Sequence, residues 1–324
     1  MEYTEVSKKE WEEIILKSGN ANFFHSPLWA KIIEETYGYR TATRLYDING
    51  KEILVPMMEK DIYGFKIFDS MPGGYDTGGL FSESDVTVDD FKLLVDDIVG
   101  GRNLSFHLAL PPYMDLSLNA KSSINDKWKI EDEFNFVHLL DLEGKDFEYI
   151  WKNDYKKNKR RGTRKAIKSG VKVREGTSLD DYKIFYDIYD KEWQKRGKNP
   201  PVPFDYFRNF YKYGSDHVKF RLATKDDEII AGRIEFWYSK TVYSFISAFS
   251  KEYGTFNPQS LLISKSIEEA CQEDYRYYNF GPSGNLINIV KFKEAFGAKK
   301  VELNRYLVYS NLAKIMNGII NLRS

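Results

Sequence analysis

The sequence lacks the features that mark secreted or membrane-spanning proteins. Its single cysteine, Cys271, excludes an intramolecular disulfide. No apolar run approaches the roughly 18 residues that span a bilayer, and the acidic segment 1–5 has the wrong charge for a signal peptide. The four histidines are scattered, so no zinc-ligand cluster is expected. We therefore expect a cytoplasmic protein with no metal site and no transmembrane segment.

The chain also lacks net charge, because 48 basic residues balance 48 acidic ones. The molecule as a whole then has no strong electrostatic attraction to nucleic acid or an anionic membrane, and DNA is not an expected partner. Aromatic residues, in contrast, are abundant at 16%. Such side chains bury large apolar areas while tyrosine keeps a polar tip, which is compatible with a ligand-lined site.

A chain of 324 residues exceeds the usual size of one hydrophobic core, so two domains are expected. The same order of elements is predicted twice: helix, helix, hairpin, strand, loop, helix, strand. In the first half these elements are 7–18, 26–38, 41–48 with 52–60, 62–68, 88–99 and 104–110. In the second half they are 179–195, 204–213, 217–224 with 229–238, 241–249, 258–272 and 276–280. We predict an α/β (α+β) fold with domains 1–135 and 136–324, and with a C-terminal helix able to pack back on the first domain.

Local signals support several of these elements. Asn49-Gly50 predicts a tight hairpin, since both residues accept positive φ. Ser26-Pro27 and Asn257-Pro258 predict helix starts with a capping residue followed by proline. The second helix start would direct free N–H groups at the loop 252–256, where an anionic or carbonyl group could bind. After strand 276–280, the turn 281–284 leads to a helix at 288–296 and a closing strand at 301–309.

The stretch 151–174 contains eleven lysine or arginine residues and one acid, Asp154. Helical spacing predicts two stripes on it. The packing stripe consists of Trp151, Tyr155, Asn158, Gly162 and Ala166. The outward stripe consists of Lys157, Arg161, Arg164 and Lys168. A solvated charged face is the simplest interpretation, but like charges at this spacing destabilise a helix by a few tenths of a kcal/mol per pair. We therefore expect the helix to meet phosphates of a nucleotide-linked substrate, of tRNA or of a lipid head group.

Several segments together resemble the Fem family of non-ribosomal peptidyl transferases and related N-acyltransferases, which are built from two domains of the GNAT fold. The segments are Phe24-His25-Ser26-Pro27-Leu28-Trp29-Ala30-Lys31, Arg160-Arg161-Gly162-Thr163-Arg164-Lys165-Ala166 with Gly170-Val171, Pro258 to Leu262, Asn279-Phe280-Gly281, and Phe292-Lys293 with Phe296-Gly297-Ala298. The resemblance covers most of the chain. It implies two tandem GNAT-like domains with mixed sheets flanked by helices.

The resemblance also implies that an activated acyl or aminoacyl group is transferred to an amine. It places Lys293 at the position of a lysine that stabilises charge on the reacting carbonyl; an exposed helix lysine is the alternative interpretation. The donor could be aminoacyl-tRNA, acyl-CoA or an acyl carrier, entering as a co-substrate without a tightly bound cofactor. Segment 253–260 departs from the pyrophosphate loop of acetyl-CoA-binding GNAT proteins because it has one glycine and no arginine. No coiled-coil arm is expected between residues 174 and 213, so a tRNA donor would have to be held by the basic stretch.

Further candidate substrate-binding residues are spread along the chain. They are Lys31, Asp76, Arg161, Arg164, Tyr253, Ser260 and Phe292. Lys31 could touch an acceptor or be a surface lysine, while Asp76 and Tyr253 could transfer protons or form hydrogen bonds. The acceptor could be an anionic small molecule, a lipid-linked cell-envelope precursor such as one of peptidoglycan, or an amino sugar, with transient contact to a membrane surface. The alternative function is a noncatalytic module that binds an anionic polymer or lipid head group.

Overall fold

The computed structural model describes residues 2–19, 21–73, 78–110, 128–130, 136–284, 286–303 and 305–313. The chain divides into two compact units, which we call unit 1 (Met1–Phe136 with Glu302–Ser324) and unit 2 (Val137–Val301). The division after Phe136 lies one residue from the expected boundary. No helix in the described ranges is both long and apolar enough to cross a membrane.

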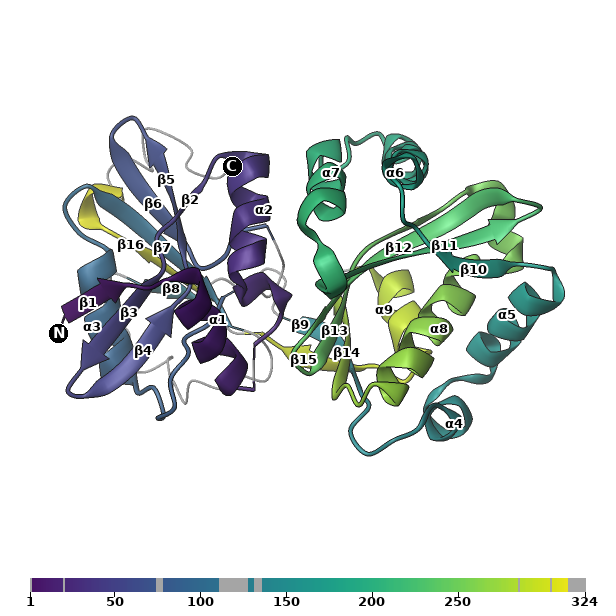
Figure 1. Ribbon diagram of the computed structural model, residues 1–324, viewed down its shortest axis with the longest axis horizontal. Helices are drawn as coiled ribbons and strands as arrows, with labels where there is room; N and C mark the ends of the chain where they lie inside the picture. The colour runs from purple at the N-terminus through teal and green to yellow at the C-terminus, as the bar shows by residue number, and fades with distance from the viewer. Residues whose placement is uncertain are drawn as a thin grey trace. The chain divides into compact units, whose positions relative to one another are not determined.

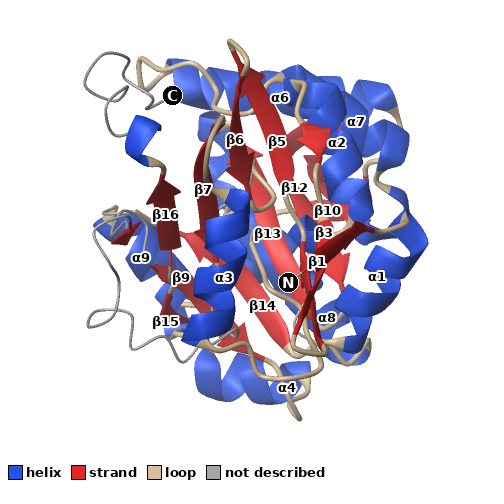
Figure 2. Ribbon diagram, turned by 90° about the vertical axis from the view of Figure 1, so that its left-hand side faces the viewer, coloured by secondary structure: helices blue, strands red, loops and turns tan. Residues whose placement is uncertain are grey.

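Unit 1 contains two β-sheets. Its elements are β1 (Glu2–Glu5), α1 (Lys8–Lys17), η1 (Phe23–His25), α2 (Pro27–Tyr37), β2 (Arg40–Thr41), β3 (Arg44–Ile48), β4 (Lys51–Val55), β5 (Met58–Ile62), β6 (Phe65–Asp69), α3 (Val88–Ile98), β7 (Asn103–Ala109), β8 (Trp128–Ile130) and β16 (Arg305–Tyr309). One sheet has the order β1-β3-β4 and the other β2-β5-β6-β7-β16-β8. Figure 2 shows α3 in front of β7, and residues of both elements share one apolar core.

The helix and turn signals in this half act as the sequence predicts. Asn49 and Gly50 join β3 to β4 with φ values of 56° and 80°. The Ser26 side chain accepts a hydrogen bond from the Trp29 N–H at 3.1 Å, and Pro27 occupies the first turn of α2. Local backbone chemistry therefore determines where these elements begin and end.

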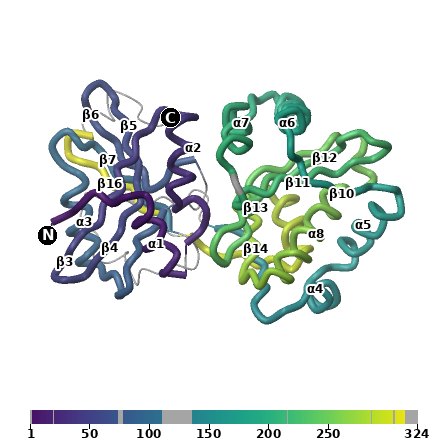
Figure 3. Tube along the Cα trace, viewed as in Figure 1, coloured from purple at the N-terminus to yellow at the C-terminus, as the bar shows by residue number. Residues whose placement is uncertain are grey.

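Two expected strands are each divided in the structure. The expected strand 52–60 is β4 and β5, which belong to different sheets and are separated by Pro56, a residue with no N–H for a ladder. The expected strand 301–309 is β15 (Lys299–Glu302) and β16, and Figure 3 shows the yellow C-terminal strand among the blue strands of unit 1. Because β16 pairs with β7 and β8, residues 302–324 belong to unit 1 and not to the second domain as expected. The expected C-terminal helix falls mostly outside the described residues.

Unit 2 contains one seven-stranded sheet of order β10-β11-β12-β13-β14-β9-β15. The strands of this sheet, apart from β15 given above, and the helices of unit 2 are β9 (Phe136–Asp141), α4 (Phe147–Tyr149), the π-helix η2 (Ile150–Asp154), α5 (Lys157–Lys168), β10 (Lys172–Glu175), α6 (Leu179–Gln194), α7 (Phe204–Tyr213), η3 (Ser215–His217), β11 (Val218–Lys225), β12 (Glu228–Tyr238), β13 (Thr241–Phe249), η4 (Lys251–Phe256), α8 (Pro258–Gln272), β14 (Tyr277–Pro282) and α9 (Ile287–Glu294). Figure 1 shows α6 and α7 on one side of the sheet and α8 on the other, with α5 packed along α8.

Both units contain a parallel strand pair joined through a helix. In unit 1, β6 and β7 are parallel and α3 connects them; in unit 2, β13 and β14 are parallel and η4 with α8 connects them. The predicted fold class, mixed sheets flanked by helices, is confirmed. The order of elements that the sequence predicts twice is present in both units.

Candidate functional site

β13 and β14 are neighbouring interior strands of the unit 2 sheet, and because they are parallel their C-terminal ends lie at the same end of it. The two parallel strands pair only over Thr241–Tyr277, Val242–Tyr278 and Tyr243–Asn279, and no later residues of β13 and β14 are paired with each other. The same end of β13 leads through η4 into the first turn of α8. In sheets with parallel strands, functional side chains gather at such C-terminal ends.

Lys293 lies at this end of the sheet, in the last turn of α9. Its Nζ donates hydrogen bonds to the carbonyl oxygens of Gly281 at 2.7 Å and Pro282 at 2.6 Å. The side chain is 8% exposed. The ammonium is therefore buried against the end of β14 and does not extend into bulk water, contrary to the alternative of an exposed helix lysine.

Other side chains hold the same turn. The Asn279 side chain accepts a hydrogen bond from the Gly281 N–H at 2.8 Å. Gly281 has a φ of +67°, and a Cβ there would lie 3.1 Å from the Tyr243 hydroxyl. On the far side of the turn, the Ser283 hydroxyl lies 3.1 Å from His138 Nδ1. The backbone that receives Lys293 is thus fixed by neighbouring strands.

His138 was given no role from the sequence, yet it belongs to this group. It is buried on β9, and burial together with the nearby Lys293 ammonium lowers the pKa of its imidazole to about 4. The imidazole is therefore neutral near pH 7. A neutral ring does not repel the ammonium of Lys293.

A buried polar network crosses the sheet beneath α8 and was also missed from the sequence. Glu235 on β12 accepts hydrogen bonds from Arg233 Nε at 3.1 Å, from the Ser266 hydroxyl at 2.6 Å and from the Tyr278 hydroxyl. Burial holds the pKa of Tyr278 well above its ordinary value, so the phenol keeps its proton. The signal was Arg233 and Glu235, two residues apart on one face of an otherwise apolar strand.

Arg233 links this network to the point where β13 and β14 stop pairing. Its guanidinium donates to Gln259 Oε1 at 3.0 Å in the first turn of α8 and to the Ser244 hydroxyl, the first β13 position beyond the paired stretch. Gln259 in turn donates to the carbonyl of Ala248 at 2.8 Å. Arg233 therefore ties β12, β13, β14 and α8 together where β13 and β14 stop pairing.

The basic stretch 151–174 is not one continuous helix, because it is divided between η2, α5 and β10. Trp151 lies in η2, and α5 begins at Lys157. Gly162 and Ala166 are buried as predicted, and a Cβ on Gly162 would lie 3.3 Å from the Ser260 hydroxyl. Asn158, expected on the packing stripe, is exposed because it occupies the first turn of the new helix. All four residues of the outward stripe, Lys157, Arg161, Arg164 and Lys168, are exposed.

The other predicted site residues are not brought together. Lys31, on α2 of unit 1, forms an ion pair with Glu35 at 3.1 Å. The Tyr253 hydroxyl donates a hydrogen bond to the Glu228 carboxylate at 2.5 Å, and this bond raises the pKa of the Tyr253 phenol. Ser260 is buried beneath α5, where its carbonyl oxygen accepts a hydrogen bond from the Thr163 hydroxyl at 3.3 Å. Asp76 lies outside the described residues.

Two further predictions concern Phe292, expected to bind substrate, and Asn257, expected to cap α8. One face of the Phe292 ring is covered by the ammonium of Lys159, which lies 3.5 Å from the ring centroid. Asn257 occupies the capping position of α8 with a φ of 57°, but its side chain makes no capping hydrogen bond and donates instead to the Thr255 carbonyl at 3.2 Å. The first turn of α8 is thus held by Gln259 and not by Asn257.

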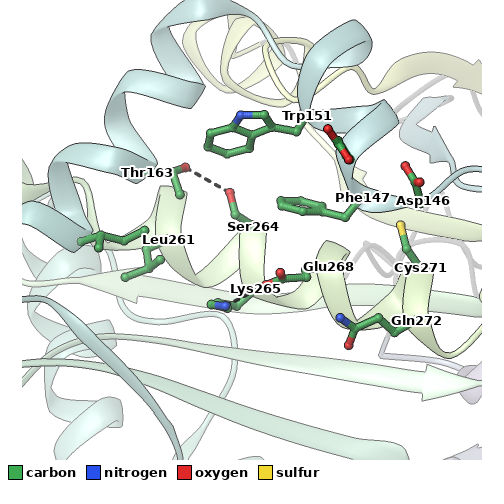
Figure 4. A pocket seen from close by; sticks show the side chains of 12 residues that line it. Asp146, Phe147, Trp151, Thr163, Leu261, Ser264, Lys265, Glu268, Cys271 and Gln272 are labelled. Atoms are coloured by element: carbon green, nitrogen blue, oxygen red, sulfur yellow. Dashed lines mark hydrogen bonds and ion pairs between the residues drawn. The ribbon is translucent and has the colours of Figure 1, made fainter.

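A cavity of about 550 Å³ lies elsewhere in unit 2, between α4, α5 and α8 (Figure 4). Phe147 and Trp151 form its aromatic wall, and Thr163 and Ser264 on its floor share a hydrogen bond at 3.0 Å. None of the residues predicted from the sequence to bind substrate lines it. Cys271 does, and burial raises the pKa of its thiol to about 11, so the thiol stays protonated.

The comparisons with known proteins agree with this architecture. Residues 153–294 match the family model described as acetyltransferase (GNAT) domain. The crystal structure of FemX matches with a TM-score of 0.76 at 13% identity, covering 99% of this chain and 100% of FemX. The chain has a tandem GNAT fold. The stretch matched by the GNAT model includes Lys293, the buried network and α5.

Two further solved structures are similar to this chain over most of its length. A tandem GNAT protein from the clavulanic acid biosynthesis pathway has a TM-score of 0.57 at 9% identity, with 95% of this chain and 98% of that chain covered. The C-terminal domain of a putative lysylphosphatidylglycerol synthetase from Agrobacterium fabrum has a TM-score of 0.55 at 14% identity, with 97% and 95% covered. No curated protein sequence matches the chain.

Proposed function

We propose that this tandem GNAT protein is an N-acyltransferase that moves an acyl or aminoacyl group from an activated donor to an amine. The observation that carries the proposal is the buried ammonium of Lys293, held by the Gly281 and Pro282 carbonyls at the C-terminal end of β14. A fixed positive charge in a site that excludes water stabilises an oxyanion far more than a solvated one.

In the proposed reaction the lone pair of a neutral amine attacks the donor carbonyl. A C–N bond forms, the carbonyl oxygen becomes negatively charged in the tetrahedral intermediate, and the Lys293 ammonium stabilises that charge. The C–O bond of an ester donor or the C–S bond of a thioester donor then breaks, and the proton lost by the amine ends on the leaving group or solvent. Arg233 acts as a positioning residue that keeps the ends of β13 and β14 in place.

Several observations support a choice of substrates. The similarity to FemX and to a putative lysylphosphatidylglycerol synthetase supports an aminoacyl donor and an acceptor of the cell envelope, such as a peptidoglycan precursor or another lipid-linked anion. The similarity to a tandem GNAT protein of the clavulanic acid pathway, solved without AcCoA, supports an acyl-CoA donor as the alternative, although segment 253–260 here has one glycine. We propose that the donor is a co-substrate, that no cofactor is tightly bound, and that the protein works in the cytoplasm with transient access to a membrane surface.

The proposal is tested by incubating the purified chain with aminoacyl-tRNA, acyl-CoA or acylated carrier protein and a panel of amines that includes amino sugars and peptidoglycan precursors. Mass spectrometry should detect an acceptor heavier by one acyl or aminoacyl group, formed by the wild type and about 10²–10³ times more slowly by Lys293→Met. Salt-sensitive binding of donor or acceptor without any product would support the noncatalytic module instead.

A further inference from the structure

Lys159 combines a positive charge with an unusual position. It lies in the first turn of α5, and its Nζ is 3.5 Å from the centroid of the Phe292 ring and 5.0 Å from that of Phe296. Its side chain is largely covered by these rings and only partly reaches solvent. Cation–π contact with two aromatic rings therefore holds the ammonium in place at the junction of α5 and α9.

No anion among the described residues compensates this charge. Within the described ranges, no carboxylate or other acceptor lies within hydrogen-bond or ion-pair distance of Lys159 Nζ, whereas the neighbouring Lys152 pairs with Glu148. Burial lowers the pKa of Lys159 to about 8, and it is the only cause. The charged groups on the adjacent elements are mostly cationic: Lys156, Lys157, Arg160 and Arg161 around it, Lys152 and Asp154 on η2, Lys265 and Glu268 on α8, and Lys291, Lys293 and Glu294 on α9.

A partly desolvated cation without a counter-ion destabilises a fold unless something else binds it. Its surroundings indicate an external anion. α5 carries seven basic residues and no acid, and its exposed stripe includes Arg161 and Arg164. The residue beneath the Lys159 ammonium, Phe292, directly precedes Lys293 in α9. A row of cations on one helix, ending beside the helix that carries Lys293, suits a ligand with several phosphates.

We propose that Lys159 binds a phosphate group of the acyl donor, at the inner end of a phosphate-binding face formed by α5. This inference rests on the proposed function and specifies how its donor is held. The shared chemistry is a phosphate ester, which both tRNA and coenzyme A contain. Lys159 contacts the donor and takes no part in breaking its acyl bond.

The inference is tested by equilibrium binding of two unacylated probes, bulk tRNA and coenzyme A, at pH 7 and pH 9. The variants are Lys159→Met and Lys159→Arg, and the control is Lys195→Met, which removes one exposed cation from the same unit away from α5. Unfolding curves establish that all variants are folded. Because the probes carry no acyl group, the measurement does not depend on turnover.

For one of the two probes we expect Lys159→Met to weaken binding at pH 7 by about tenfold, as for loss of one charge-assisted contact. If the probe is tRNA, the slope of log affinity against log salt should also fall by about 0.7 to 0.9. Wild-type binding should weaken as pH rises through about 8, because the ammonium loses its proton. Lys159→Arg should bind equally well at pH 7 and pH 9, since a guanidinium keeps its charge.

Equal affinities of wild type and Lys159→Met for both probes would overturn the inference, as would failure of the wild type to bind either. A drop in Lys195→Met as large as that in Lys159→Met would also overturn it, because the effect would then reflect total charge. The proposed function fails separately: Lys159-dependent probe binding without transfer would leave the phosphate-binding role of Lys159 and remove the function, and transfer that is unaffected by Lys159→Met would leave only the function.

Discussion

The two units share a parallel strand pair connected through a helix, but the helices cover very different interiors. In unit 1, α3 presents Phe91, Leu94 and Ile98 to an apolar core that includes residues of β7 and β16. In unit 2, the corresponding helix α8 buries Ser260, Ser264 and Ser266, and beneath it lie Arg233 and Glu235. The layer beneath the helix is thus apolar in unit 1, whereas in unit 2 it combines apolar clusters with a buried polar network.

This difference indicates that the interior of unit 1 mainly stabilises the fold, whereas part of the interior of unit 2 positions the candidate site. Burial of apolar side chains under α3 stabilises unit 1, and the buried acid of that helix, Asp90, lies in its first turn and pairs with Lys51 at 2.7 Å. In unit 2 the buried charges fix the strand ends next to Lys293, at the cost of removing ionised groups from water. A polar interior that contributes little net stability is expected when it positions a site.

The largest effect should come from removing one partner of the buried network. Arg233→Met leaves the buried Glu235 carboxylate with the Nε of Arg221, 3.5 Å away, as its one remaining guanidinium contact among the described residues, and should destabilise unit 2 by about 3–5 kcal/mol. Leu94→Ala in α3, the matched truncation in unit 1, should cost about 2–5 kcal/mol by leaving a cavity. Hydrogen exchange read peptide by peptide should localise the first loss to β12–β14 and the second to α3 and β7.

A double variant sharpens the same contrast. In Arg233→Met with Glu235→Leu neither of these two charges remains and Arg221 keeps its ion pair with Glu269 at 2.5 Å, so most of the lost stability should return. If the network positions the site, acyl transfer should nevertheless stay impaired. Full recovery of both stability and transfer would mean that the network has no positioning role.

A smaller, pH-dependent effect should distinguish the buried histidine of unit 1. His25 Nδ1 accepts a hydrogen bond from the Asn22 N–H at 3.0 Å, so Nε2 carries the proton and donates to the Gly78 carbonyl at 2.6 Å. Burial lowers the pKa of His25 from 6.5 to about 3. The unfolded chain therefore binds the extra proton first as pH falls below 6.5, and unit 1 should lose up to about 1.4 kcal/mol per pH unit from this group.

The measurement is urea unfolding between pH 7 and pH 5, with hydrogen exchange of η1 and α2 reporting on unit 1. His25→Gln, which cannot titrate, should remove this part of the slope at some cost in stability at pH 7. A slope that is identical in wild type and variant would show that His25 is not neutral in the folded unit.

The smallest effect is expected on the exposed face of α5. Arg161→Gln should change the free energy of unfolding by no more than about 0.5 kcal/mol, because the side chain is exposed and no ion pair holds it among the residues described. Its effect should instead appear in the salt dependence of donor binding. Thermal unfolding and a salt titration together check this, and a clear loss of stability would assign the helix a structural role.

Much of the fold could be predicted because its signals are local. Asn49-Gly50 and Ser26-Pro27 determine backbone conformation within a few residues, so the hairpin and the start of α2 were correct. The division of residues 301–309 between two sheets could not be predicted, since it depends on which distant strands have a free edge. Asn257 was expected to cap α8, but its side chain makes no capping hydrogen bond, and Gln259 instead ties the first turn of α8 to the carbonyls of Gly232 and Ala248.

The site was predictable in identity more than in arrangement. The resemblance of the Phe292-Lys293 segment indicated the lysine, yet its partners, the carbonyls of Gly281 and Pro282, follow from how α9 packs on β14. Arg233 and Glu235 left a readable pattern, two charges on one face of a buried strand, that was overlooked. Lys159 was counted within a charge run, and only packing against Phe292 separates it from the other cations.

The most direct test of the account is the catalytic constant of Lys293→Met measured beside Lys291→Met, which removes an exposed lysine from the same helix. With both variants folded by circular dichroism, kcat of Lys293→Met should fall by about 10²–10³ while that of Lys291→Met stays near the wild-type value. A folded Lys293→Met protein that transfers acyl groups at the wild-type rate would contradict the claim that the chemistry occurs at this lysine.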